Sequence, residues 1–161
     1  MPVKPERKQP RLSEYDYGTA GCTFVTLCTQ DRANLFQMEP PANDSMGNRV
    51  LRRGLRLLEE HFPGVTVDKY VIMPDHLHLM ITIGETQTRQ AIPDVMQYFK
   101  TITTNDYIRG VKAGFLPPFH GKLWQRSYYD HVIRNQQDYD ETWQYIENNP
   151  TKWMMLHNIT P

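Results

Sequence analysis

Two runs of β-prone residues joined by a very short connection constrain the fold of this chain most strongly. Residues 65–72 (VTVDKYVI) and 76–83 (HLHLMITI) are rich in β-branched residues, and only the tripeptide MPD separates them. A connection of this length joins two strands as an antiparallel hairpin, because parallel strands need a crossover of about a dozen residues or more. The sequence therefore predicts a β-hairpin over residues 65–83.

The rest of the chain supplies two further strands and three helices. Residues 22–29 (CTFVTLCT) carry the β-branched and aromatic residues typical of a strand, and residues 48–62 place apolar side chains on one helical face. The same reasoning predicts a helix over residues 88–108, a strand over residues 128–133 and a final helix over residues 136–149, which Pro150 ends. The order β-α-β-β-α-β with a C-terminal helix indicates an α+β, ferredoxin-like fold, in which helices cover one face of an antiparallel sheet.

Length and composition fit one globular domain. The chain has 161 residues, of which 39% are hydrophobic, and this composition excludes a collagen, a coiled coil and a disordered chain. Residues 1–14 are basic and proline-rich, so we expect them to form a tail and residues 15–161 to form the single domain. The 18 basic and 18 acidic residues cancel, so only local charge can indicate a nucleic-acid partner.

A reduced, cytoplasmic setting is the simplest expectation. No apolar run approaches the roughly 18 residues that a membrane span needs, and no apolar stretch follows the charged first residues as it would in a secretory signal. Cys22 and Cys28 lie at the two ends of one predicted strand, about 20 Å apart. At that distance they cannot form a disulfide with each other.

His76 and His78 form the most informative pattern of the predicted hairpin. Side chains alternate along a strand, so the two imidazoles point to one face of the sheet and Leu77 points to the other. Two adjacent imidazoles can begin a metal site, although such a pair is more often structural. A catalytic site needs a third ligand, and the candidates are Asp75, His120, His131 or a side chain of the last helix.

The predicted last helix carries a second polar pair. Tyr139, Trp143 and Ile146 recur at helical spacing and are predicted to form its buried stripe. Tyr145 lies about 120° away from that stripe, and Asn149 follows it by four residues on the same face. Spacing alone favours a rim tyrosine and a helix-capping asparagine.

Basic residues gather in two further parts of the sequence. Arginines of the helix predicted over residues 48–62 lie at helical spacing opposite its leucines, as either a phosphate-contacting face or an ordinary solvated one. Residues 107–134 hold five basic residues against one Asp, with aromatic residues between them. This mixture suits base stacking along a basic groove, provided that the aromatics do not all belong to the core.

Four segments together carry a resemblance to a known family. They are RLSEYDYGTAGCTFVTLCTQDR, VIMPDHLHLMI, LWQRSYYDHVIRN and YIENNPTKW, which lie in this order between residues 11 and 153. The chain resembles the REP-associated tyrosine transposases, which belong to the single-tyrosine branch of the HUH (His–hydrophobic–His) superfamily of single-strand DNA nucleases. The resemblance implies a ferredoxin-like fold with the histidine pair on a central strand.

The resemblance also implies a reaction and its residues. Tyr145 matches the nucleophilic tyrosine, His76 and His78 match the metal-ligand histidines, and Asn149 matches the position of a third ligand. The implied cofactor is a divalent cation, Mg²⁺ or Mn²⁺, and the implied partner is single-stranded or hairpin DNA of REP type. The expected activity is cleavage and rejoining of that DNA through a 5′-phosphotyrosine. We expect the DNA to be contacted by Arg11, Arg49, Arg52, Arg53, Arg56, Lys122, Trp124 and Arg126.

Three other interpretations stay open at this point. A hairpin-binding protein that no longer cuts DNA would be expected to lose the histidines or the tyrosine, and this chain keeps both. A metal-dependent hydrolase that uses water would form no covalent adduct, and a protein with purely structural histidines would not depend on metal. The sequence is compatible with either a monomer or a homodimer.

Overall fold

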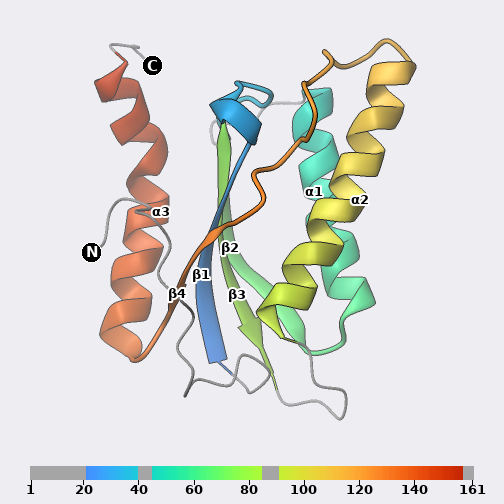
Figure 1. Ribbon diagram of the computed structural model, residues 1–161. Coiled ribbons are helices and arrows are strands. Elements are labelled where there is room, and N and C mark those ends of the chain that lie inside the picture. The colour runs from blue at the N-terminus through green and yellow to red at the C-terminus, as the bar shows by residue number, and fades with distance from the viewer. Residues whose placement is uncertain (1–20, 40–44, 85–90, 158–161) are drawn as a thin grey trace.

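A four-stranded antiparallel sheet forms the centre of the computed structural model, with helices on both of its faces (Figure 1). The structure describes residues 21–39, 45–84 and 91–157. The predicted tail and Arg11 lie outside these ranges. The elements are β1 (Gly21–Cys28), a 3₁₀ turn η1 (Gln30–Arg32), α1 (Met46–His61), β2 (Val65–Met73), β3 (His76–Ile83), α2 (Ile92–Lys112), β4 (Tyr129–Val132) and α3 (Gln136–Leu156). This order confirms the predicted β-α-β-β-α-β pattern with an additional helix.

The predicted hairpin forms the β2–β3 half of the sheet. Pro74 and Asp75 make its turn, and Met73 lies opposite His76 in the register. The strand order is β2-β3-β1-β4, and every neighbouring pair is antiparallel. β1 and β3 are therefore the central strands, so the histidines lie at the middle of the sheet, at the end where β1 finishes.

Alternation along β3 separates an apolar face from a face that carries the histidines. Leu77, Leu79 and Ile81 are buried in the main core, which α1 and α2 cover. Met80 belongs to a smaller cluster on the opposite face, beneath α3. The sequence correctly predicted that the leucines and the histidines face opposite ways.

Close contact between α1 and α2 depends on Gly54. A Cβ atom at this position would lie 2.6 Å from Thr103 Cγ2 and 3.0 Å from Phe99 Cε1, well inside the usual separation of non-bonded carbon atoms. The missing side chain thus lets the two helices pack as one layer over the core.

Helix α3 departs from its prediction in length and in rotation. It continues past Pro150 to Leu156, although proline cannot donate the hydrogen bond to the carbonyl four residues earlier, a loss of about 3 kcal/mol in a helix interior. Beyond the proline, Trp153 packs against the smaller cluster, with its ring centroid 6.2 Å from that of His76. The buried residues of α3 are Thr142, Ile146, Asn149 and Pro150. The predicted buried stripe is therefore confirmed for Ile146 and, in part, for Tyr139, which packs against the same cluster. It was wrong for Trp143, which is 37% exposed.

Polar contacts fix α3 to the sheet. Tyr139 Oη donates to Asp68 Oδ2 at 2.8 Å, and Lys69 pairs with Glu147 and lies over the ring of Trp143. These groups hold Trp143 at the surface, and the helix therefore turns a different face toward the histidines.

Two smaller findings complete the fold. Cys22 and Cys28 are free thiols, and burial raises the pKa of Cys22 to about 11. Among the described residues, no helix combines the length and the apolar character needed to cross a membrane.

Candidate active site

His76, His78, Tyr145 and Asn149 meet in one cavity between the end of the central strands and α3. The cavity measures about 280 Å³. Its lining residues are Thr26, Cys28, Arg32, His76, His78, Tyr145, Asn149, Lys152, Trp153 and Leu156. Residues that are about 70 positions apart in the sequence are thus brought together by one helix of the same chain.

Both histidines are oriented by hydrogen bonds at Nδ1. His76 Nδ1 lies 2.7 Å from Asp75 Oδ1, and His78 Nδ1 lies 2.8 Å from Thr26 Oγ1. An ionised carboxylate only accepts hydrogen bonds, so His76 donates from Nδ1 and keeps its lone pair on Nε2. The ring centroids are 4.6 Å apart, which places the two imidazoles side by side.

The electrostatics favour neutral imidazole at His78 and ionised carboxylate at Asp75. Burial, with help from the neighbouring His76 and Arg32, lowers the pKa of His78 well below its usual value. Burial alone would raise the pKa of Asp75, but hydrogen bonds with His76 and Arg32 lower it overall. A neutral imidazole is the form that ligates a metal, and a carboxylate behind a ligating histidine strengthens the ligand.

Tyr145 packs directly beside the histidines. Its ring centroid lies 5.5 Å from that of His78 and 5.9 Å from that of Phe24. Burial raises the pKa of Tyr145, and a hydrogen bond with the Asn149 side chain partly opposes this rise. Spacing favours a rim position for Tyr145, and the side chain is half-buried, with its ring packed against the sheet.

The residues present fit a divalent cation. The two imidazoles offer Nε2, and Asn149 offers an amide oxygen at the same cavity. Imidazole suits divalent transition metals, and amide oxygen suits Mg²⁺ and Mn²⁺, so the mixed donor set fits a divalent cation. Over residues 21–39, 45–84 and 91–157, no group of three or more His, Cys, Asp or Glu side chains forms a metal site.

The other proposed third ligands lie elsewhere. His131 is on β4, where its Nε2 lies 2.9 Å from Asp138 Oδ2, and neither it nor His120 lines the cavity. Asp75 lies behind His76 and is absent from the cavity lining. Of the candidates, Asn149 of the last helix lines the cavity together with the histidines.

Two cations at the cavity were missed by sequence reasoning. Arg32 lies in η1, and its Nε donates to Asp75 Oδ2 at 3.0 Å. Lys152 lies on α3, with Nζ 6.0 Å from the centroid of the Tyr145 ring. Among the described residues, no Asp or Glu lines the cavity, so its charge suits an anionic group such as a phosphodiester.

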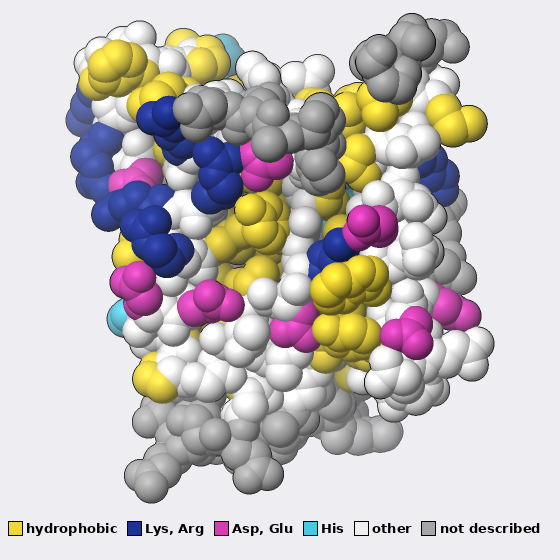
Figure 2. Space-filling view, turned by 180° about the vertical axis from the view of Figure 1, so that it is seen from behind, with side chains coloured by type: hydrophobic (Ala, Val, Ile, Leu, Met, Phe, Trp, Pro, Cys, Tyr) yellow, Lys and Arg dark blue, Asp and Glu magenta, His cyan; other side chains and the backbone are white. Residues whose placement is uncertain are grey.

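The arginines predicted on α1 are largely paired with carboxylates. Arg52 pairs with Glu39, and Arg53 pairs with Asp106. Arg56 lies 3.6 Å from Glu60. Figure 2 shows Lys and Arg side chains gathered over the layer of α1 and α2, with acidic side chains beside them. This pairing reduces the net charge that the α1 face presents.

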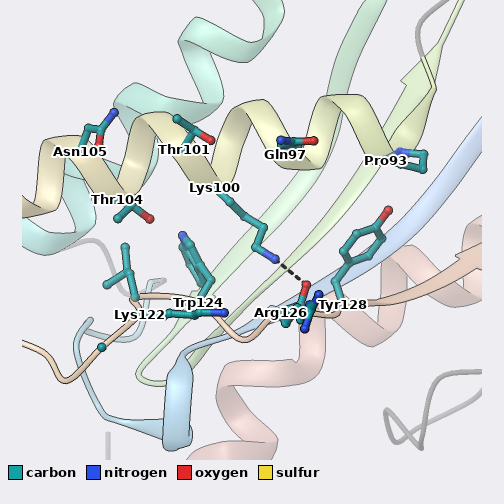
Figure 3. Close-up of a pocket in the computed structure, with 12 residues that line it drawn as sticks. Pro93, Gln97, Lys100, Thr101, Thr104, Asn105, Lys122, Trp124, Arg126 and Tyr128 are labelled. Carbon is teal, nitrogen blue, oxygen red and sulfur yellow. Dashed lines mark hydrogen bonds between the residues drawn. The ribbon is translucent and has the colours of Figure 1, made fainter.

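Lys122 and Arg126 lie at a larger pocket of about 790 Å³ between α2 and the segment that leads into β4. Lys100 Nζ extends from α2 and donates to the Arg126 carbonyl at 2.9 Å (Figure 3). Lys122 and Arg126 are exposed, and no carboxylate pairs with either among the described residues. They therefore present open positive charge, in contrast to the α1 arginines.

The side chain of Trp124, which the sequence predicts to contact DNA, is buried in this structure. It is 3% exposed and stacks on Phe36 with ring centroids 5.7 Å apart. Its Nε1 donates to Thr103 Oγ1 at 2.9 Å. The aromatic character of this segment thus serves the core, where a large ring with one hydrogen-bond donor finds its partner.

We predict that Trp124→Ala destabilises the fold by about 3–5 kcal/mol, because it leaves a cavity and removes the hydrogen bond to Thr103 Oγ1. Trp124→Phe should cost less, since it fills most of the volume and removes one hydrogen bond worth about 1 kcal/mol. Urea denaturation followed by circular dichroism measures both. Trp143→Ala is the matched surface control, and an equal loss in that variant would contradict the burial argument.

Comparisons with known proteins agree with this geometry. The model of the family described as "Transposase IS200 like" matches residues 24–149. An uncharacterised protein of Haemophilus influenzae is 32% identical over 163 residues, covering 91% of this chain and 89% of that protein. A second protein of that organism, provisionally named a REP-associated tyrosine transposase, is 29% identical and covers 88% of this chain and 77% of its own length.

A solved structure confirms the fold. It is that of a REP-associated tyrosine transposase bound to a REP hairpin, with a TM-score of 0.62 and 22% identity. The match covers 88% of this chain and 74% of that chain.

Proposed function

This chain belongs to the family of IS200-like transposases, and from that premise we propose that it cleaves and rejoins single-stranded DNA through a covalent 5′-phosphotyrosine at Tyr145. The observation that carries the proposal is the shared cavity of His76, His78, Tyr145 and Asn149. A tyrosine beside two oriented imidazoles suits attack on a phosphodiester, and the described residues that line the cavity include the cations Arg32 and Lys152 and no carboxylate.

The proposed step is a transesterification. The Tyr145 hydroxyl oxygen bonds to phosphorus and loses its proton, while the bond from phosphorus to the 3′ oxygen breaks and that oxygen takes up a proton. The products are a 5′-phosphotyrosine and a free 3′-OH. No co-reactant is needed, because the ester bond is kept and a 3′-OH can reverse the step at a new junction. Phenolate leaves more readily than an alkoxide because its conjugate acid has a reference pKa near 10.

His76, His78 and Asn149 would hold the divalent cation. Such an ion supplies Lewis-acid stabilisation of the charge that develops on the phosphate. Asp75 and Thr26 hold the Nδ1 atoms of the imidazoles, so that both Nε2 atoms stay directed away from these partners. Asn149 also contacts the Tyr145 hydroxyl, and this contact orients the nucleophile next to the metal ligands.

We propose hairpin DNA with a single-stranded flank as the substrate. Support comes from the relative named for REP elements and from the related structure that holds a REP hairpin. The geometry favours catalysis within one chain, since α3 packs on the sheet of its own chain and brings Tyr145 to His78 there. We therefore propose that Tyr145 acts with the histidines of its own chain.

A labelled-adduct assay tests the proposed function. An oligonucleotide library with a REP-type hairpin and randomised flanks is incubated with the protein and Mg²⁺ or Mn²⁺, then run on a denaturing gel. We expect a slow protein–DNA band with 3′-labelled DNA, because a 5′-phosphotyrosine retains the downstream fragment. The 5′-labelled fragment should be released, and EDTA should remove both products.

Other outcomes would identify a different activity. Metal-dependent cleavage without a covalent band would indicate a water nucleophile and contradict the proposal. Binding without cleavage or adduct would indicate a hairpin-binding protein instead.

Contacts to DNA outside the cavity give a second prediction. Lys122→Ala and Arg126→Ala should each weaken hairpin binding and reduce the slope of log affinity against log salt by about 1. Arg53→Ala is the matched control, because its guanidinium already pairs with Asp106 and should neutralise less phosphate charge. Fluorescence anisotropy at several salt concentrations measures the slopes. A larger slope change for Arg53→Ala than for Lys122→Ala would contradict the prediction.

A further inference from the structure

The turn that follows β1 has a backbone conformation that residues other than glycine rarely adopt. Its residue Arg32 lines the cavity of Tyr145. Asp31 and Arg32 have φ angles of 58° and 54°, the positive values among non-glycine residues of the described ranges. Thr29 anchors the turn at its start, since its N–H donates to the Asp75 carbonyl at 3.0 Å and its Oγ1 donates to the Ala33 carbonyl at 2.8 Å. Residues in such strained backbone conformations persist where the surrounding structure enforces them, and they cluster at functional sites.

This turn aims the Arg32 guanidinium along the cavity wall. Nε donates to Asp75 Oδ2 at 3.0 Å, and the other oxygen of the same carboxylate accepts from His76 Nδ1. Across the described residues, the two terminal amino groups of Arg32 have no hydrogen-bond partner. The side chain is 48% exposed and lines the same cavity as Tyr145. One edge of the guanidinium is therefore fixed, and the other is open to a ligand.

We propose that Arg32 is a catalytic residue whose terminal amino groups bind non-bridging oxygens of the scissile phosphate. The inference rests on the proposed function, because it needs Tyr145 to attack a phosphodiester in this cavity. While the Tyr145–phosphorus bond forms and the bond to the 3′ oxygen breaks, the non-bridging oxygens carry the negative charge. A planar guanidinium matches two such oxygens with two parallel N–H donors.

Asp75 links this contact to the metal-ligand histidine. One of its oxygens holds Arg32 and the other holds His76, so a single carboxylate positions both groups. We assign Asp75 as a positioning residue, which acts on the phosphate through these two partners. The short hairpin turn that carries Asp75 thereby sets the spacing between the proposed phosphate contact and the metal ligand.

Arg32→Gly tests the proposal with the least disturbance of the backbone, because glycine accepts a positive φ. We expect the rate of adduct formation to fall by about 100-fold, the usual effect of losing one donor to a developing oxyanion. Arg32→Lys should retain part of the rate, and guanidinium chloride at non-denaturing concentration should partly rescue Arg32→Gly. Arg109→Ala is the control, since this exposed arginine also pairs with a carboxylate and lies away from the cavity.

A modified substrate separates direct contact from positioning. A methylphosphonate at the scissile position removes the negative charge that Arg32 is proposed to neutralise. The rate loss in Arg32→Gly should therefore be smaller on this substrate than on the natural phosphate. An equal loss on both substrates would reduce Arg32 to a positioning residue for Asp75 and overturn the direct contact.

Two further results would also overturn the proposal. Adduct formation by Arg32→Gly at the rate of the unaltered chain would remove any role of Arg32 and leave the proposed function standing. Absence of a Tyr145-dependent adduct in the unaltered chain would instead contradict the proposed function and this inference together. Thermal melting of each variant shows that the fold is intact before the rates are compared.

Discussion

Replacing Tyr145 with phenylalanine should abolish the covalent protein–DNA adduct and strand cleavage, with a loss on the order of 10⁴-fold or more, because the nucleophilic oxygen is removed. The phenylalanine ring can keep the contacts with Phe24 and His78, so the fold should survive. The cost in stability is expected to be about 1 kcal/mol, from the lost hydrogen bond with Asn149. Hairpin affinity should change little, since the hydroxyl supplies none of the basic contacts.

Tyr139→Phe is a matched control on the same helix. Its hydroxyl donates to Asp68, and burial together with that carboxylate raises the pKa of Tyr139 to about 12. This variant should lose similar stability and keep the adduct, because Tyr139 does not line the cavity. A gel with 3′-labelled hairpin DNA compares the two variants directly. An adduct that survives in Tyr145→Phe would assign the nucleophile to another residue and contradict the proposal.

The parts of the fold that could be predicted depend on local sequence. The two-residue turn forces a hairpin, and alternation along 76–83 forces the histidines and leucines onto opposite faces, whatever the rest of the chain does. The rotation of α3 could not be predicted in this way. Tyr139, Trp143 and Ile146 form a valid apolar stripe, but Lys69 on β2 lies over the ring of Trp143, which stays 37% exposed. Tyr139 and Ile146 pack on the sheet, as the stripe predicts.

The site shows the same division between local and tertiary information. The roles of His76, His78 and Tyr145 came from the family resemblance, and the structure brings these residues into one cavity without testing their chemistry. Arg32 was missed because no sequence pattern signals a left-handed turn at a non-glycine residue. The arginines of α1 meet carboxylates such as Glu39 and Asp106 that only the tertiary fold brings to them.

Removing either histidine should lower affinity for the divalent cation by at least about 100-fold, or about 3 kcal/mol, and should remove metal-dependent adduct formation. The effect is expected to be large because His76 and His78 are the two imidazoles among the described residues that line the cavity. Asp75→Asn should have a smaller effect, about 10- to 100-fold, since it weakens the orientation of His76 without removing a ligand.

Electron paramagnetic resonance of Mn²⁺ measures this affinity without DNA, so the result does not depend on catalysis. His131→Ala is the control, because that imidazole pairs with Asp138 in the first turn of α3, away from the cavity lining, and should leave Mn²⁺ affinity unaltered. Both histidines are buried, so each alanine variant also leaves a cavity. The melting temperatures of His76→Ala and His78→Ala must therefore be measured, to show that a loss of Mn²⁺ affinity is not a loss of folding. If His76→Ala and His78→Ala remain folded and bind Mn²⁺ as tightly as the unaltered chain, the histidine pair is structural and the metal lies elsewhere. The proposal instead expects a graded loss of Mn²⁺ affinity. The loss should be absent in His131→Ala, intermediate in Asp75→Asn, which only weakens the orientation of His76, and largest in His76→Ala, which removes a ligand.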